Sequence, residues 1–497
     1  MSDEKDWVAV TDLLLARAER FPDRVAMNVN GTGGITYREW QRRVNRTANG
    51  LLRAGVRRGD AIALLFGGMD WIDYAVAYLA VLSAGACGVH LHESYPQAEL
   101  ERRLAEGGVR GVIHGAGPRP PRRAGVWART VADLDDGDET PVAVDLAPGD
   151  IADILYTSGT TGPAKGFTNP HGNLTFGRGP EGLRQFEKPT PMLAPMPLGT
   201  TSSATTVAII ALTSPAELIL TPVDDVERMG ELIARFRIGS IMITPRTAMR
   251  MIASGLGERH DLSTVERIAI ASAPLPPAIS RALLALYPGA QLSTAYSQSE
   301  AVPAVIVATF DDARPTTLGR PAPGTELRLC DERGDPVPAG KLGEIRLRSR
   351  APRRRYLDQE RDARAHVDGW TRTGDLGHLD EDGFLYLFDR REDALAGNAG
   401  LVSSVAVENA LYEHPAVLEA AVVAVPGRRE AGAREGTGAD AVVVLRDPRA
   451  LDELPGFLAG RLKPHERPER FHAWPSLPRG VTGKVLKAVI RRQLGPS

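Results

Sequence analysis

The chain has 497 residues, which predicts more than one folded unit. It is 43% hydrophobic and 25% charged with a formal net charge of −2, so neither a disordered chain nor a nucleic-acid or anionic-membrane partner is indicated. Cys87 and Cys330, the two cysteines, lack zinc-site spacing and favour a reducing compartment.

The N-terminal part predicts alternating helices and short strands. Residues 1–6 lack a signal-peptide pattern, and the apolar stretch 74–89 is shorter than the about 20 residues that cross a membrane. We therefore expect a cytoplasmic protein without a membrane partner. Periodicity predicts a helix over 8–21, a helix that begins at Thr36–Tyr37, strands at 25–29 and 61–66, a buried strand at 112–113 and a surface loop over 115–126.

The next element is an unusual run. Residues 156–166 read Tyr-Thr-Ser-Gly-Thr-Thr-Gly-Pro-Ala-Lys-Gly after an apolar lead-in, and they predict backbone and hydroxyl donors beside one positive charge. That chemistry holds a polyphosphate and points to ATP. A P-loop is excluded because Ala164 stands where a glycine is needed and Gly166 follows Lys165. The candidate ligands are Thr157, Ser158, Gly159, Thr160, Thr161, Gly162 and Lys165.

Helices and strands continue to alternate after this run. A helix is predicted over 224–237, a strand over 240–244, a helix from Pro245, and a strand over 268–271 that leads into the turn 272–277. This spacing favours a layered α/β architecture.

A break falls near 389–393, and the remaining strands (420–425, 441–445) and the helix over 451–462 predict a compact α+β unit. Residues 427–438 are expected to form a mobile loop. The predicted domains are 1–389 and 394–497, joined by a charged linker at 390–393.

Three further motifs carry polar chemistry. Tyr296-Ser-Gln-Ser-Glu300 offers a ring that can stack on a base and a carboxylate for a hard cation. Asp375, in Gly-Trp-Thr-Arg-Thr-Gly-Asp, can accept hydrogen bonds from ribose hydroxyls or simply cap its turn. Lys484, in Leu-Pro-Arg-Gly-Val-Thr-Gly-Lys, can neutralise charge at an α-phosphate or belong to a solvated basic tail. Only seven lysines occur in the chain, so Lys165 and Lys484 gain weight.

Together with Asp389-Arg-Arg-Glu-Asp393, these motifs resemble the adenylate-forming superfamily of AMP-dependent synthetases and ligases, which includes acyl- and aryl-CoA synthetases, peptide-synthetase adenylation domains and luciferases. The resemblance covers nearly the whole chain. It implies a large N-terminal layered α/β region with a small mobile C-terminal α+β domain. It also implies ATP-dependent conversion of an acid to an acyl-adenylate, with release of pyrophosphate and then transfer to an acceptor.

The same resemblance implies roles for particular residues. Tyr296 would stack on adenine, Asp375 would bind ribose, Arg390 would contact ribose or phosphate, Glu392 would be the hinge, and Lys484 would assist adenylation. Glu300, with Lys165 and Lys484, is expected to be catalytic. Glu300 and Thr161 are the expected Mg²⁺ ligands, and the other nucleotide contacts would be Ser272, Ala273, Pro274, Ala295, Ser297 and Ser299.

Two segments depart from the family pattern and leave the substrates open. Residues 195–203 lack the usual histidine or Phe-Asp, which disfavours a standard amino acid and predicts a remodelled acid pocket. Residues 396–404 depart from the segment that builds a thiol tunnel, so CoA, a carrier-protein thiol and an amine all remain as acceptors. A small oxyacid such as nitrite, joined in an N–N bond, is a further alternative, as is a catalytically silent nucleotide-binding partner.

Three histidines are also considered. His90 and His92 lie on one face of a predicted strand and could pair as metal ligands, but no third ligand is near and packing is favoured. His171 is expected to be structural.

Overall fold

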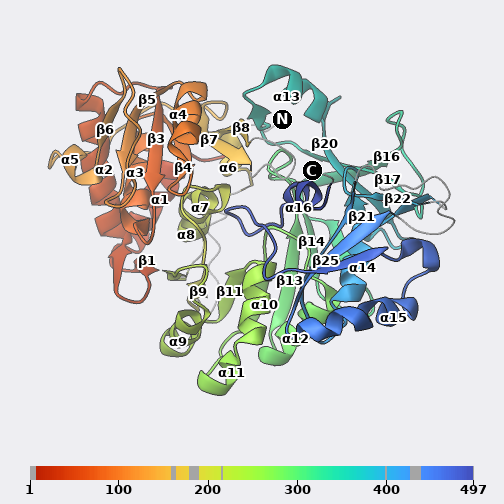
Figure 1. The fold of residues 1–497 in the computed structure, drawn as a ribbon. Coiled ribbons are helices and arrows are strands. Elements are labelled where there is room, and N and C mark those ends of the chain that lie inside the picture. The colour runs from red at the N-terminus through yellow and green to blue at the C-terminus, as the bar shows by residue number, and fades with distance from the viewer. Residues whose placement is uncertain are drawn as a thin grey trace.

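The protein is described here from a computed structural model, in which a large α/β region is followed by a small C-terminal domain (Figure 1). Colour in Figure 1 runs from the red N-terminal strands to the blue C-terminal domain. The structure describes residues 7–157, 164–177, 190–213, 216–397, 400–425 and 438–495.

The first sheet of the large region is mainly parallel, in the order β18-β8-β7-β4-β3-β5-β6. Strands β3 to β7 pair in parallel, whereas β8 and β18 are antiparallel additions at one edge. The carboxyl ends of the parallel strands β3 to β7 therefore lie at the same edge of the sheet. The strands are β3 (Ala61–Phe66), β4 (Cys87–His92), β5 (Val109–His114), β6 (Trp127–Arg129), β7 (Ile151–Thr157), β8 (Lys165–Pro170) and β18 (Arg355–Tyr356).

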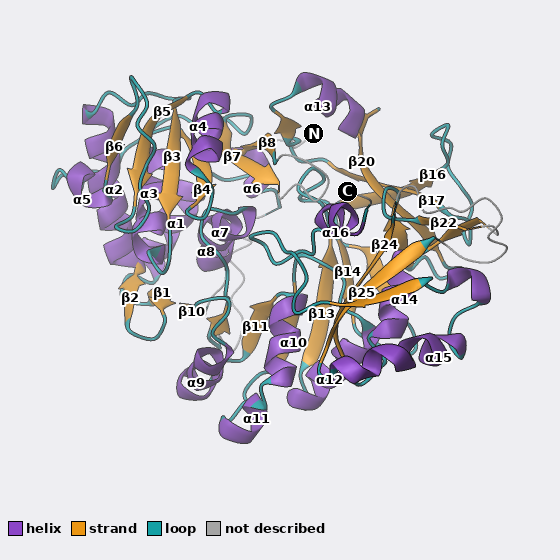
Figure 2. Ribbon diagram, in the orientation of Figure 1, coloured by secondary structure: helices purple, strands orange, loops and turns teal. Residues whose placement is uncertain are grey.

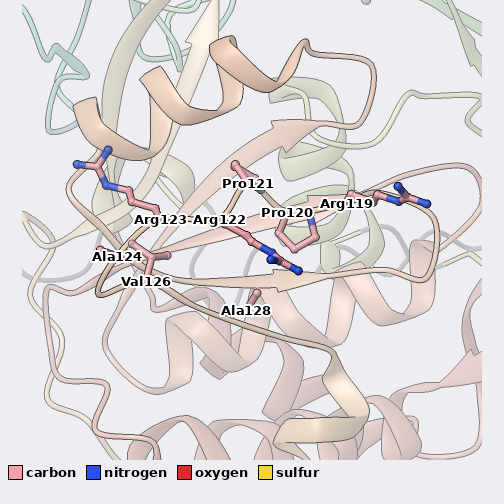
Figure 3. A pocket seen from close by; sticks show the side chains of 8 residues that line it. All are labelled: Arg119, Pro120, Pro121, Arg122, Arg123, Ala124, Val126 and Ala128. Atoms are coloured by element: carbon pink, nitrogen blue, oxygen red, sulfur yellow. The ribbon is translucent and has the colours of Figure 1, made fainter.

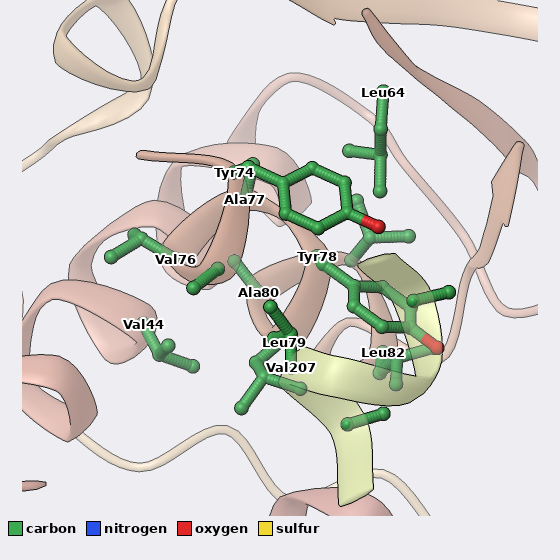
Figure 4. Close-up of a cluster of buried hydrophobic side chains, with 14 of the residues drawn as sticks. Val44, Leu64, Tyr74, Val76, Ala77, Tyr78, Leu79, Ala80, Leu82 and Val207 are labelled. Carbon is green, nitrogen blue, oxygen red and sulfur yellow. The ribbon is translucent and has the colours of Figure 1, made fainter. Parts of the chain in front are cut away.

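Helices pack against this sheet and bury its apolar residues (Figure 2). Every residue of α3 except Ile72 and Asp73 is buried, and Figure 4 shows its tyrosines and aliphatic side chains packed with Leu64 and Val207. The helices are α1 (Val10–Arg20), α2 (Tyr37–Arg53), α3 (Trp71–Ser83), α4 (Gln97–Glu106), α5 (Val131–Leu134), α6 (His171–Leu174), α7 (Thr201–Thr205), the π-helical turn Thr206–Ile210 and α8 (Ala211–Thr213).

The second sheet continues the large region in the order β16-β17-β20-β21-β15-β14-β13-β12-β11-β9-β10-β1-β2, with β19 beside β20. Its strands from β1 through β13 are mostly parallel, and the later ones are antiparallel. They are β1 (Val25–Val29), β2 (Gly33–Thr36), β9 (Met192–Leu193), β10 (Leu218–Leu220), β11 (Ser240–Ile243), β12 (Arg267–Ile270), β13 (Gln291–Tyr296), β14 (Ile306–Thr309), β15 (Thr317–Pro321), β16 (Thr325–Cys330), β17 (Gly343–Ser349), β19 (His366–Val367), β20 (Trp370–Leu379) and β21 (Leu385–Arg390).

Local signals explain why the helices of this region begin where they do. The Thr36 side chain accepts a hydrogen bond from the Glu39 N–H at the start of α2. Thr244 caps α10, in which Pro245 is the first residue. The predicted helices and strands of the large region are confirmed within a few residues. Its remaining helices are α9 (Val226–Phe236), α10 (Pro245–Ala253), α11 (Leu256–Arg259), α12 (Pro277–Leu286) and α13 (Gln359–Ala365).

The C-terminal domain is a small α+β unit, as predicted. A hairpin of β22 and β23 precedes the sheet β24-β25-β26, in which β25 pairs antiparallel to β24 and parallel to β26. The helix expected over 451–462 is shorter, because a 3₁₀ turn precedes it and Gly460 follows its end. The expected loop at 427–438 falls almost wholly outside the described residues. The elements are β22 (Leu395–Gly397), β23 (Gly400–Val402), α14 (Ser404–Leu411), β24 (Val417–Ala424), β25 (Ala439–Leu445), 3₁₀ turn Pro448–Glu453, α15 (Leu454–Ala459), 3₁₀ turn Pro464–Glu466, β26 (Arg470–Ala473) and α16 (Lys487–Leu494).

The cysteines and the apolar helices can be compared with the expectations from composition. Both cysteines are free thiols in buried positions. No described helix has both the length and the apolar character needed to cross a membrane.

Candidate active site

A cavity of about 390 Å³ brings together residues from four of the sequence motifs. It is bounded by the start of β8, the turn after β13, the middle of β20 and the end of β21. Its lining is almost entirely polar or charged, which suits a phosphorylated ligand. The lining residues are Lys165, Gln298, Glu300, Tyr356, Ala365, Arg372, Thr373, Gly374, Arg390, Arg391 and Glu392.

The predicted phosphate loop connects two paired strands. Thr157 ends β7 and lies opposite Lys165, the first residue of β8. Burial lowers the pKa of Lys165, with Arg361 adding to the effect and the carboxylates of Glu300 and Glu392 opposing it. Lys165 thus lies within electrostatic reach of both acids. The candidates Ser158, Gly159, Thr160, Thr161 and Gly162 lie outside the described residues.

Asp375 is buried directly after Gly374, which lines the cavity, and two donors hold its carboxylate. The Tyr296 hydroxyl and the Gln298 Nε2 each donate to its Oδ2 at 2.8 Å. Its Oδ1 is buried and accepts no hydrogen bond from the described residues, although Arg390 Nε is 3.4 Å away. Burial raises the pKa of Asp375, and Arg390 opposes that shift. One carboxylate oxygen is therefore positioned by protein while the other retains hydrogen-bonding capacity.

Glu300 lines the cavity and lies within electrostatic reach of Lys165 at the start of β8. The Tyr356 hydroxyl donates to its Oε1, and no described residue donates to its Oε2. Burial, followed by the charge of Glu300, raises the pKa of Tyr356, so the phenol keeps its proton. No group of three potential metal ligands exists among the described residues. A single carboxylate with an available oxygen fits Mg²⁺, which is commonly bound by one or two carboxylates with phosphate and water.

Lys484 reaches this cluster from the C-terminal domain. It follows Gly483, whose φ of +78° allows the tight turn, and its carbonyl accepts from Gly480 N–H at 3.0 Å. Burial lowers the pKa of Lys484, Arg390 lowers it further, and Asp375 and Glu300 oppose the change. Lys484 therefore shares two charged neighbours, Glu300 and Arg390, with Lys165.

The predicted hinge lies where β21 ends. Arg391 N–H donates to the Gly374 carbonyl at 2.9 Å, and Arg390 lies 3.7 Å from Glu392 Oε1. Within the segment 396–404, the described residues belong to the paired strands β22 and β23 and to the start of α14, where Ser403 accepts from Ala406 N–H at 3.0 Å.

Two basic residues of the C-terminal helix α16 are paired with acidic side chains. Lys487 Nζ is 2.7 Å from Glu408 Oε1 and also donates to Ser404 Oγ at 2.7 Å. Arg491 pairs with Asp393. The alternative of a solvated tail is therefore wrong for Lys487 and Arg491.

The remaining predicted nucleotide contacts do not line the cavity. Ser272 has a φ of +80°, a strained conformation for a residue with a side chain, and begins the turn that continues through Ala273 and Pro274. Ser297 Oγ donates to the Ala304 carbonyl at 2.6 Å, and the Ser299 carbonyl accepts from Arg354 at 3.0 Å. Ala295 is exposed on β13.

Sequence reasoning missed Gln298, Tyr356 and Arg372 as lining residues. Gln298 lies inside the predicted Tyr-Ser-Gln-Ser-Glu motif, so the motif itself was a signal. Arg372 likewise lies inside the predicted motif 369–375, whereas Tyr356 comes from a strand that only the folded chain brings to Glu300.

A second cavity, of about 700 Å³, contains none of the predicted site residues. It is lined by residues 119–124 with Val126 and Ala128, on the loop before β6 (Figure 3). Its three arginines, Arg119, Arg122 and Arg123, make it basic, but it has no carboxylate and no residue of the motifs.

Known proteins are similar to this chain along most of its length. Residues 14–357 match the AMP-binding enzyme family, and residues 406–484 match the AMP-binding enzyme C-terminal domain. A feruloyl-CoA synthase of Amycolatopsis sp. is 31% identical, with 96% of this chain and 98% of that protein aligned. A 4-coumarate–CoA ligase-like protein of Oryza sativa subsp. japonica is 26% identical over 98% and 93% of the two chains.

A solved structure also matches over nearly its full length. The ATP-bound MatB of Rhodopseudomonas palustris is 25% identical, with a TM-score of 0.86 and coverage of 98% of this chain and 99% of that one. The large α/β region with a small C-terminal domain is thus the arrangement of adenylate-forming enzymes. The chain belongs to the AMP-binding enzyme family and is an AMP-forming acid ligase that uses ATP to activate an acid as its adenylate.

Proposed function

We propose that the chain activates an aromatic or related organic acid with Mg·ATP and transfers the acyl group to a thiol, with CoA as the first candidate. The gathering of Lys165, Glu300, Asp375 and Lys484 around one polar site carries the first half of this proposal. The acid and acceptor classes rest on the feruloyl-CoA synthase that is similar along nearly the whole chain.

In the first half-reaction, a carboxylate oxygen of the acid attacks the α-phosphorus of ATP. The bond between the α-phosphorus and its bridging oxygen breaks, and pyrophosphate leaves. Lys165 stabilises charge on the polyphosphate, and Lys484 stabilises charge that builds up between the acid and the α-phosphate. No covalent nucleophile of the protein is required, so positioning supplies much of the catalysis.

Asp375 and Tyr296 would orient the nucleotide. Asp375 accepts from the ribose through Oδ1, which has no hydrogen-bond donor among the described residues. Tyr296, fixed through its hydroxyl at Asp375, presents its ring to adenine. Ser272, Ala273, Pro274, Ala295, Ser297 and Ser299 complete the nucleotide environment.

Mg²⁺ would be held by Glu300, with Thr161 as a second ligand. When bound, the ion neutralises charge on the phosphates and the leaving pyrophosphate. Tyr356 orients the Glu300 carboxylate while leaving Oε2 available.

The second half-reaction requires a change of domain orientation. We take residues 1–389 and 394–497 as the two moving parts, with Glu392 as the pivot in 390–393. The electrostatic contact of Lys484 with Asp375 and Glu300 supports an adenylation orientation in this structure. Rotation about Glu392 would withdraw Lys484 and bring the segment 396–404 toward the adenylate.

An amine acceptor is the second candidate. The observation in its favour is that residues 396–404 depart from the usual family pattern of the segment that builds the thiol tunnel in CoA ligases.

A screen of pyrophosphate release tests the proposal. Aromatic, fatty, β-amino and small inorganic acids are assayed with CoA, with a carrier protein, with an amine and with no acceptor. We expect release with aromatic acids and a thioester only when CoA is present. If pyrophosphate is released without a thioester and an amide forms in the assay with the amine, the amine is the acceptor and CoA is not. No release with any acid would overturn catalysis and support a silent nucleotide-binding protein.

A metal titration tests Glu300. Glu300→Gln retains the hydrogen bond from Tyr356 but loses the negative charge, so half-saturation by Mg²⁺ should rise about 10- to 100-fold. Glu266→Gln, at an exposed acid beside Arg267 that does not line the cavity, is the matched control. An unchanged Mg²⁺ requirement in Glu300→Gln would remove the metal role.

A further inference from the structure

A line of buried polar side chains runs through the large region from helix α7 to the carbonyl of Ser299. The proposed reaction uses none of these side chains. Each is at most 3% exposed, which makes such a concentration of polar groups costly unless all are paired. They are Ser203, Tyr74, His90, Asp153, Asn169 and Arg354.

Arg354 forms the end nearest the candidate active site. Its Nε donates to Asn169 Oδ1 at 3.1 Å and to Asn173 Oδ1 at 3.0 Å, and its Nη1 donates to the Ser299 carbonyl at 3.0 Å. Ser299 immediately precedes Glu300. Arg354 itself is two residues before Tyr356, which donates to Glu300. One guanidinium therefore braces both chain segments that set the position of the Glu300 carboxylate.

Asp153 supplies the counter-charge for this buried cation. It is bridged to Arg354 through Asn169, whose Nδ2 donates to Asp153 Oδ2 at 3.1 Å. Burial lowers the pKa of Arg354 to about 10, and Asp153 and then Glu300 oppose the shift. The planar fork of arginine suits three fixed acceptors in a way that a lysine ammonium does not.

The line continues from Asp153 to α7 through an ordered set of donors. His90 Nε2 lies 3.0 Å from Asp153 Oδ1, and the Tyr74 hydroxyl lies 2.8 Å from His90 Nδ1 and 3.2 Å from Ser203 Oγ. Each ring nitrogen of His90 therefore has one polar partner, Asp153 at Nε2 and Tyr74 at Nδ1.

At its far end the line meets the segment expected to precede the acid pocket. Ser203 exchanges hydrogen bonds with Thr200, which starts α7. Gly199, at a φ of +70°, packs so tightly that a Cβ there would lie 2.1 Å from the Leu91 carbonyl oxygen of β4, the strand that carries His90. The segment 195–203 is thus fixed to the strand that carries the buried polar line.

We propose that Arg354 is a positioning residue for Glu300, and that Asp153, His90 and Tyr74 connect this anchor to α7 and so hold the acid-binding segment and the metal-binding carboxylate in one arrangement. The inference rests on the proposed roles of Glu300 and of residues 195–203. Groups that orient a metal ligand commonly matter almost as much as the ligand.

Binding of ATP tests the anchor without relying on turnover. Arg354→Lys keeps the positive charge but cannot reach all three acceptors. Calorimetry with Mg²⁺ should show ATP affinity reduced by about tenfold, while affinity measured with a chelator and no Mg²⁺ should change less than about twofold. Arg353→Lys, at the neighbouring exposed arginine that pairs with Asp362 at 3.1 Å, should match wild type in both measurements. An equal change with and without Mg²⁺ would overturn the anchor.

A second variant covers the case in which Arg354→Lys does not fold. Asp153→Asn combined with Arg354→Gln removes both buried charges and should show the same Mg²⁺-specific loss of ATP affinity. An unaffected Mg²⁺ contribution in the folded double variant would also overturn the proposal. Because ATP binding is measured directly, a wild type that activates no acid would refute the proposed function while leaving this test intact.

The link to α7 is tested at Tyr74. Tyr74→Phe removes one buried hydroxyl and should raise KM for the acid about fivefold with KM for ATP unchanged. Tyr287→Phe, at a buried tyrosine whose hydroxyl contacts no other polar group than Met251 Sδ (3.8 Å) among the described residues, should alter neither. Equal behaviour of the two phenylalanine variants would overturn the link.

Discussion

The large region and the C-terminal domain supply the candidate site in different ways. The large region presents Lys165, Glu300 and Asp375 from strands or from turns beside strands, and Tyr356 and Gln298 position the two acids. The C-terminal domain presents one lysine, Lys484, on a turn before α16. The first set is preorganised by hydrogen bonds within one region, whereas the second depends on how the domain is placed. Nucleotide binding should therefore be separable from adenylation by mutation.

The largest effect is expected at Lys484. Lys484→Ala should lower the rate of adenylation about 10²- to 10³-fold, because charge at the α-phosphate loses its partner, while ATP still binds. Acid-dependent pyrophosphate exchange and calorimetric ATP binding measure the two effects. Lys463→Ala, at an exposed lysine of the same domain, is the matched control. If pyrophosphate exchange is unchanged in Lys484→Ala, the C-terminal domain does not supply the adenylation lysine.

The neighbouring lysine should affect stability instead. Lys487→Met leaves Glu408 buried without its partner and should lower the free energy of unfolding of the C-terminal domain by about 3 kcal/mol. Denaturant unfolding measures this loss. The double variant Lys487→Met/Glu408→Leu removes both charges and should recover most of it. If Lys487→Met instead reduced adenylation without destabilisation, the assignment of the two lysines would be reversed.

A smaller effect is expected at the ribose position of the large region. Asp375→Asn keeps the shape but weakens acceptance from ribose hydroxyls, and KM for ATP should rise about tenfold. KM for the acid should stay near its wild-type value. Asp382→Asn, at a half-exposed acid paired with Arg314, is the control. A rise in acid KM with ATP KM unchanged would contradict the ribose role.

The smallest effect concerns pH. Burial lowers the pKa of His171, with Asp153 and Asp150 opposing the change, so the folded chain keeps the ring neutral. The unfolded chain takes up a proton below the ordinary value of 6.5, and this contribution to stability is therefore present above that pH and lost as pH falls below it. His171 should contribute at most about 1.4 kcal/mol of loss per pH unit.

Urea unfolding at a series of pH values measures this slope. His171→Gln should flatten it, and His465→Gln should not. If His171→Gln leaves the pH dependence of the free energy of unfolding unchanged, another residue takes up the proton.

Local signals predicted much of the secondary structure. Thr36, Thr244 and Pro245 lie at helix starts because capping depends on neighbours in sequence. The role of Lys487 was not predictable in this way, since its partner Glu408 is far away in the chain. The same holds for Tyr356, which reaches Glu300 only because β18 adds to the edge of β8.

The histidines show the same division. His90 was expected to pack, and it is buried, but its partners Tyr74 and Asp153 come from α3 and β7. An alternating strand pattern reports that a side chain faces inward and does not report what it meets.

By itself, the sequence determined the α/β class, the family and the chemistry of acid activation, because motifs of contiguous residues carry the donors and charges for a polyphosphate. The tertiary structure decided that Lys487 pairs with Glu408, how Glu300 and Asp375 are oriented, and that a buried line of polar groups lies beneath Glu300. Those features depend on distances between segments far apart in the chain, which only packing establishes.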